Sequence, residues 1–106
     1  MLPKKNRLSA GEVREVFAFN EKSSSSPFFK ILKKFKVNSL KFAVIVPGSV
    51  SKSAVKRNYL RRKFFSALKD IYKDQEKGWY VIILRKEAEK KSQQEIEKYL
   101  EKTLKN

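Results

Sequence analysis

Residues 79–84 read Trp-Tyr-Val-Ile-Ile-Leu, an uninterrupted apolar run rich in residues that favour β-strands. A strand that is apolar at every position has no side suited to water. We therefore predict a central strand that is covered on both faces. Gly78, directly before the run, ends the pattern that precedes it. Together with the helices and strands predicted elsewhere in the chain, this run indicates a small mixed sheet packed by helices.

Helices are predicted in the sequence both before and after this strand. One spans residues 53–74, and another begins at Ser92, where Ser92 and Glu95 form a Ser-x-x-Glu capping box. A third begins at Ser9, which forms the same box with Glu12, and ends near residues 19–20. Each carries an apolar stripe at helical spacing. These stripes are Leu60, Phe64, Ala67, Leu68 and Ile71; Ile96, Tyr99, Leu100, Thr103 and Leu104; and Val13, Val16 and Phe17.

Two further strands are predicted between the first two helices. They cover residues 28–37 and 40–46, and residues 38–39 (Asn-Ser) would form a hairpin turn between them. Residues 21–27 (Glu-Lys-Ser-Ser-Ser-Ser-Pro) are expected to be a flexible connection. The predicted order is α-β-β-α-β-α in an α/β (α+β) sandwich, with residues 1–106 as a single domain.

Charge is the strongest functional signal in the chain. There are 26 Lys and Arg residues against 11 Asp and Glu, a formal net charge of +15. Residues 22–69 carry thirteen basic and no acidic side chains, whereas the segments on either side are nearly balanced. Such a one-sided block indicates a surface that meets a polyanion, and nucleic acid is the polyanion that it favours.

Several function classes are excluded or disfavoured by composition. With no cysteine and no histidine, the chain has no thiolate zinc site and no His-based acid–base or nucleophile system. No apolar run approaches the length of a membrane span, and residues 1–12 lack the apolar region of a signal peptide. We expect a cytoplasmic protein with no membrane association, no catalytic residue and no metal site of its own.

The densest basic cluster opens the helix predicted at 53–74. Arg57, Asn58, Arg61 and Arg62 would span an arc of roughly 140° beside the apolar stripe. Guanidinium groups bind phosphate oxygens in pairs and stack on bases, and an amide can pair with a sugar or base edge. A solvated helix face would normally include Glu at i, i+4, and none is present. The candidate RNA-binding residues are therefore Lys52, Lys56, Arg57, Asn58, Arg61 and Arg62.

This cluster resembles the signature of bacterial ribonuclease P proteins: small and apolar residues, then Arg-Asn-Arg, an apolar residue and a basic pair. The matching segment is Ala-Val-Lys-Arg-Asn-Tyr-Leu-Arg-Arg at 54–62, where Tyr59 stands in the place of the third motif residue. Asn-Arg-Leu at 6–8 and the Val-Phe pair at 16–17 resemble the opening of the family, and the strand at 79–84 and the terminal helix also fit.

The resemblance implies a rare left-handed βαβ crossover and a division of labour. The helix predicted at 53–74, which carries Arg57 and Asn58, would contact a catalytic RNA. A cleft between the first helix and the sheet would hold the 5′ leader of precursor tRNA. Mapped onto this chain, the cleft would involve Val13, Phe17, Lys30 and Leu32. The protein would be the non-catalytic subunit, a monomer in a 1:1 complex. It would bind no cofactor tightly, and the RNA partner would require Mg²⁺ for hydrolysis.

Two alternatives remain open from the residues themselves. A generic RNA-binding or ribosome-associated protein would explain the charge equally well. A protein-only nuclease would need converging carboxylates to hold metal ions. The eight acids after residue 69 are mostly interspersed with lysines, so we interpret them as solvated ion-pair positions.

Overall fold

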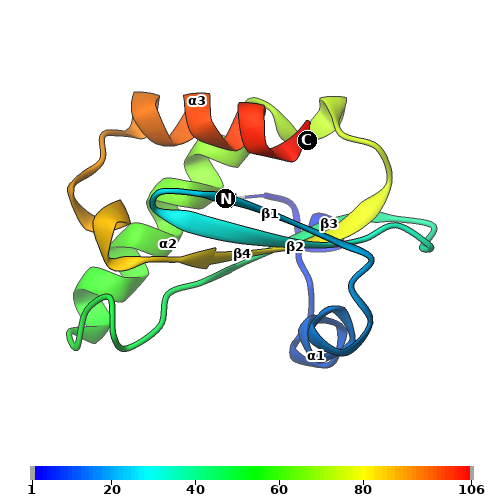
Figure 1. Ribbon diagram of the computed structural model, residues 1–106, viewed down its shortest axis with the longest axis horizontal. Coiled ribbons are helices and arrows are strands. Elements are labelled where there is room, and N and C mark those ends of the chain that lie inside the picture. The colour runs from blue at the N-terminus through cyan, green and yellow to red at the C-terminus, as the bar shows by residue number, and fades with distance from the viewer. Residues whose placement is uncertain (1, 106) are drawn as a thin grey trace.

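The strand β4 (Gly78–Leu84) lies in the interior of a four-stranded sheet whose order is β1-β2-β4-β3. The structure is a computed structural model that describes residues 2–105. One helix, α1, crosses one face of the sheet, and α2 and α3 cover the other (Figure 1). The predicted α+β sandwich and its central strand are confirmed. The other elements are α1 Ala10–Phe19, β1 Lys22–Ser26, β2 Phe29–Lys34, β3 Leu40–Ile45, α2 Ala54–Lys69 and α3 Gln93–Leu104.

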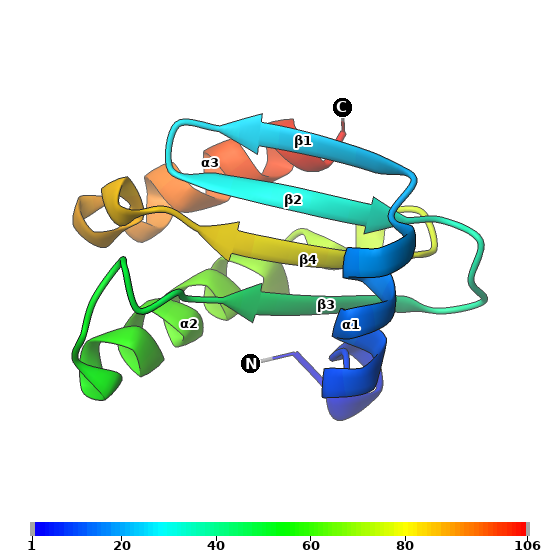
Figure 2. The same ribbon diagram turned by 60° about the horizontal axis from the view of Figure 1, so that its bottom comes forward.

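The connection from β3 through α2 to β4 is left-handed. β4 pairs in parallel with β3 and antiparallel with β2, and β1 pairs antiparallel with β2. Figure 2 shows β3 and β4 running the same way, with α2 behind the sheet and α1 in front of it. Crossovers between parallel neighbours are right-handed in about 98% of cases, so helix and strand patterns would not predict this one.

Residues 21–27 are not a flexible connection, and the order of elements gains a strand there. Lys22–Ser26 forms β1, which pairs with β2 in a register from Lys22↔Lys33 to Ser26↔Phe29. Ser26 is buried, and its hydroxyl lies within hydrogen-bonding distance of the backbone of Phe28 and Phe29. Four serines show no apolar alternation, so the strand has no local signal. It forms because the outer edge of β2 offers unpaired backbone groups.

The predicted hairpin at residues 38–39 is also wrong, because β4 lies between β2 and β3 in the sheet. β2 ends at Lys34, and the following connection passes the start of β4 to reach the opposite edge. Ser39 accepts hydrogen bonds there from Gly78 N to its carbonyl oxygen (3.0 Å) and from Trp79 Nε1 to its hydroxyl (3.0 Å). A hairpin pattern cannot reveal that a later strand will be inserted between its two arms.

The helix boundaries follow local signals closely. Both predicted capping boxes are present, at Ser9–Glu12 and Ser92–Glu95, and α1 and α3 begin directly after the two capping serines. The predicted helix 53–74 is shorter, because α2 ends at Lys69 and a 3-10 turn follows at Tyr72–Asp74. Its predicted apolar stripe, Leu60 to Ile71, is nevertheless buried along its whole length. Burial of this stripe against the sheet determines which side of α2 is left for solvent.

A charged residue, Lys33, lies in the core on the α2 and α3 side. This side chain is 1% exposed and shares its face of β2 with Phe29 and Ile31. Its ammonium donates to the carbonyl oxygens of Thr103 (3.1 Å) and Leu104 (3.3 Å). Lys33 therefore caps the C-terminal end of α3, where the helix dipole favours a cation. In the sequence, Lys33 only interrupts the apolar alternation that Phe29 and Ile31 begin.

Candidate nucleic-acid interface

The first half of α2 projects basic side chains into solvent. Ser53 caps the helix by accepting a hydrogen bond from the Lys56 backbone N–H (3.3 Å). The buried stripe begins only at Leu60, so the first turns are free of the core. Four of the six predicted RNA-binding residues are exposed: Lys52, just before the helix, and Lys56, Asn58 and Arg62 on it.

The other two, Arg57 and Arg61, are half-buried and held in defined orientations. Arg57 Nη1 donates to the carbonyl oxygen of Ser51 (2.9 Å) in the loop before the helix. Arg61 Nη1 donates to Asn58 Oδ1 (2.6 Å). Asn58 therefore positions a guanidinium as well as presenting an amide of its own. Pre-orientation lowers the side-chain entropy lost when such a group binds phosphate.

Within residues 2–105, no carboxylate forms an ion pair with this surface. Among residues 2–105, the ion pairs Glu12–Lys41, Lys91–Glu95 and Glu101–Lys105 all lie outside α2. The cations of α2 thus keep their full attraction for an external polyanion.

A second surface lies on the opposite face of the sheet, around α1. Val16 of α1 is fully buried against Leu32 and Val81, with Val13 packed at the edge of this small cluster. Phe17, one turn after Val13, is 48% exposed. Of the four predicted cleft residues, Leu32 thus forms the floor beneath α1, Val13 is half-buried, and Phe17 and Lys30 are accessible.

Residues that the sequence analysis missed complete this face. α1 crosses one end of the sheet and leaves the other end uncovered (Figure 2). Lys30 lies there between Ser25 of β1 and Ile83 of β4, and Ile45 of β3 pairs with Ile83. Ile83 and Ile45 are half-buried. Successive side chains of a strand point to opposite faces of the sheet, and Ile83 falls on the face of β4 that is turned toward α1. Only the strand order places it beside Lys30.

A hollow of about 580 Å³ joins the two surfaces around the outer edge of β3. Lys41 and Glu12 form an ion pair in its wall (2.8 Å). The hydrogen bond from Lys41, together with one from the Ser9 backbone, holds the pKa of Glu12 below its usual value. The Glu12 carboxylate is thus ionised and already paired within the protein. The cations of the hollow are Lys4, Arg7, Lys41 and Arg61, of which the sequence analysis had assigned only Arg61 to a site.

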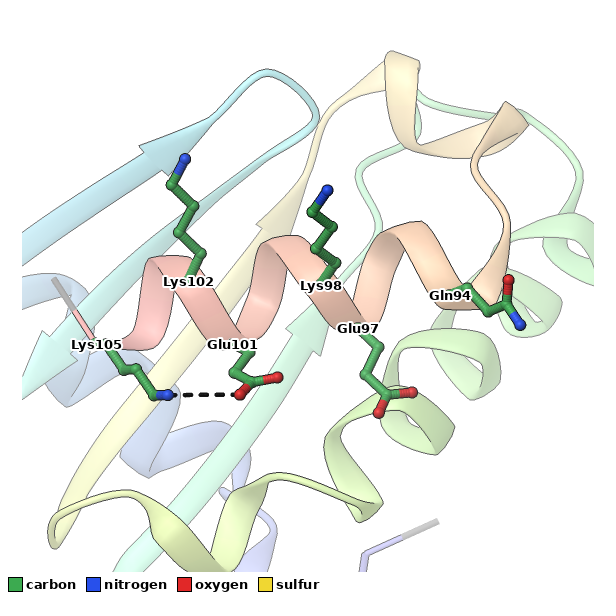
Figure 3. A pocket seen from close by; sticks show the side chains of 6 residues that line it. All are labelled: Gln94, Glu97, Lys98, Glu101, Lys102 and Lys105. Carbon is green, nitrogen blue, oxygen red and sulfur yellow. Dashed lines mark hydrogen bonds and ion pairs between the residues drawn. The ribbon is translucent and has the colours of Figure 1, made fainter.

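The outer face of α3 has the opposite character. Figure 3 shows Lys98 and Lys102 pointing to one side of the helix and Glu97 and Glu101 to the other, with Glu101 paired to Lys105 (3.4 Å). This mixture is typical of a solvated helix face. Within residues 2–105, no three Asp or Glu side chains come together as metal ligands would, and a protein-only nuclease would require such a group. No helix in the same range is long and apolar enough to cross a membrane.

Comparison with known proteins gives one family and one fold. The family model described as Ribonuclease P matches residues 2–106. The RNase P protein of Staphylococcus aureus has a similar structure (TM-score 0.81, 18% identity), with 96% of this chain and 94% of that chain covered. The RNase P protein of Thermotoga maritima is similar too (TM-score 0.80, 20% identity), with 93% and 94% covered. No curated protein sequence matches the chain significantly.

Proposed function

The chain belongs to the ribonuclease P protein family, and from this premise we propose that it is the protein subunit of ribonuclease P. In this role it binds the catalytic RNA and the 5′ leader of precursor tRNA and assists removal of the leader. The observation that carries the proposal is the exposed start of α2. Arg57 and Arg61 are pre-oriented there among further cations, and residues 22–69 contain no acid.

The two surfaces suit two different ligands. The α2 surface is densely cationic, which favours the phosphate backbone of a folded RNA. The α1 face combines an exposed aromatic ring, Phe17, with Lys30 and the half-buried Ile83. Stacking surfaces beside cations are typical of proteins that bind single strands, so this face fits the leader.

The chemistry of cleavage belongs in this proposal to the RNA and its metal ions. The chain has no histidine or cysteine for proton transfer or nucleophilic attack. Its contribution is to neutralise phosphate repulsion and to position the leader, which lowers the Mg²⁺ concentration that the RNA requires. We further propose that it acts in the cytoplasm as a monomer in a 1:1 complex and holds no cofactor tightly.

The direct test is cleavage of precursor tRNA by the cognate catalytic RNA at low Mg²⁺, with and without the protein. We expect strong stimulation, because the exposed cations of residues 22–69 replace metal ions in screening RNA phosphates. An unrelated basic RNA-binding protein of similar net charge is the control. Stimulation by the control to the same degree, or equal affinity of the chain for arbitrary RNAs, would instead favour a generic RNA-binding protein.

Phe17→Ala should weaken binding of precursor tRNA by the complex on the order of tenfold, because one aromatic stacking contact is worth about 1–3 kcal/mol per base. Affinity for mature tRNA, which has no leader, should stay unchanged. Phe19→Ala is the matched control, since Phe19 is 67% exposed on the same helix and belongs to neither surface. An equal loss of affinity for tRNA with and without the leader would rule out Phe17 as a leader contact.

A further inference from the structure

Tyr59 is an exposed aromatic ring in the midst of the cations of α2. Its side chain is 63% exposed, and Val55, one turn earlier, is 78% exposed. At about 100° per residue, Tyr59 lies on the flank of α2 toward α3, away from the flank that carries Arg57 and Arg61. The ring therefore belongs to a different part of the surface from the arginine pair.

This flank of α2 borders a hollow of about 500 Å³ against the start of α3. Two hydrogen bonds hold its walls together: Gln93 Nε2 donates to Ser66 Oγ (3.1 Å), and the Lys63 ammonium donates to the Lys91 carbonyl oxygen. Lys63 Nζ also lies 5.8 Å from the centre of the Tyr59 ring. The Tyr59 ring thus lines the hollow together with the polar side chains of Ser66 and Gln93.

We propose that this hollow binds one unpaired nucleotide of the partner RNA, with its base stacked on Tyr59. The inference rests on the proposed function, since it takes the RNA as given and adds a site to the protein. A base has a π-face that can stack on the tyrosine ring whatever its identity. The hydroxyl of Ser66 and the amide of Gln93 lie where a base edge can form hydrogen bonds.

Charge favours a nucleotide over a peptide as the occupant. The lining residues are Tyr59, Arg62, Lys63, Ser66 and Gln93, of which two are cationic and none is acidic. Arg62 is exposed and lies one turn after Tyr59, so its guanidinium can reach the phosphate of a nucleotide whose base covers the ring. A peptide would find no carboxylate in this hollow for its own cations.

The test compares Tyr59→Leu and Tyr59→Phe with the wild-type protein in binding to the cognate catalytic RNA at fixed salt. Tyr59→Leu should bind on the order of tenfold more weakly, and Tyr59→Phe, which keeps the ring, should bind within about twofold of wild type. Phe19→Leu, on the other face of the sheet, is the matched control and should have no effect. Circular dichroism should show the same helix content for all four proteins.

The salt dependence of binding separates stacking from charge. The slope of log affinity against log salt should be the same for Tyr59→Leu and wild type, whereas Arg62→Gln should lower it by roughly 0.7 to 0.9, the value of one phosphate contact. Wild-type affinity for Tyr59→Leu, or an equal loss in Tyr59→Phe, would overturn the stacking site and leave the proposed function intact. Failure of the wild-type protein to bind the catalytic RNA would overturn the proposed function itself.

Discussion

Arg57→Ala/Arg61→Ala is expected to weaken binding to the catalytic RNA by about 100-fold at moderate salt. Each guanidinium can form a charge-assisted hydrogen bond with phosphate, which contributes at least about 1.5 kcal/mol, so about 100-fold is the lower limit for losing both. Both groups are held in place before binding, by the Ser51 carbonyl oxygen and by Asn58 Oδ1. Their contribution is therefore offset less by the entropy of ordering them. The measurement is equilibrium binding across a salt series, in which the slope should fall by about two phosphate contacts.

Lys98→Ala/Lys102→Ala is the matched control, because it removes the same charge from the mixed surface of α3 (Figure 3). It should reduce affinity only through the weaker long-range field, which is screened within about 10 Å at 0.1 M salt. The unfolding free energy of both double variants should be measured as well, since Arg57 also contacts the loop before α2. If the control loses as much affinity as the arginine variant, binding depends on net charge alone.

Lys33→Ala should lower the free energy of unfolding by about 3 kcal/mol. The substitution removes a side chain that is 1% exposed, which leaves a cavity, and it deprives the carbonyl oxygens of Thr103 and Leu104 of their donor. Lys33→Met keeps most of the packing and loses only the polar contacts, so its effect should be smaller, about 1 kcal/mol. Urea unfolding measures the free energy of unfolding of both variants. Hydrogen exchange should show the last turn of α3 opening first in them.

Lys30→Ala is the control for this series, because Lys30 is exposed on the other face of the same strand and should change stability by less than about 0.5 kcal/mol. Burial, with a smaller effect from Lys22, lowers the pKa of Lys33 below its usual 10.5. At a pH between the lowered pKa of Lys33 in the folded protein and its usual pKa of 10.5 in the unfolded chain, the unfolded chain holds a proton that the folded protein has released. The contribution of Lys33 to stability should therefore rise as the pH increases toward 10.5. Equal unfolding free energies for Lys33→Ala and Lys30→Ala would show that Lys33 does not anchor α3.

Local signals predicted most of the elements and the more exposed part of the site. Capping boxes at Ser9 and Ser92 are made by residues three positions apart, and the stripe of α2 repeats within each turn. Such patterns can be recognised in the sequence because the interacting residues are close together along the chain. The cationic start of α2 could be identified in the same way, since a helix displays near neighbours on one side.

Contacts between distant segments were decided by the tertiary structure alone. β1 exists because β2 offers it an edge, and β4 separates two strands that a local pattern would pair as a hairpin. The Tyr59 hollow has two walls because Gln93 of α3 meets Ser66 of α2. Lys33, surrounded by apolar residues, finds its acceptors at Thr103 and Leu104, about seventy positions away.

The sequence by itself thus determined the helices, the buried strand, the family resemblance and the cationic block. Tertiary structure decided the strand order, the burial of Lys33 and which side chains share a surface. The physical reason is that helix caps and periodicity depend on neighbours within a few residues. Pairing and burial depend instead on which distant segments gain most free energy by covering each other.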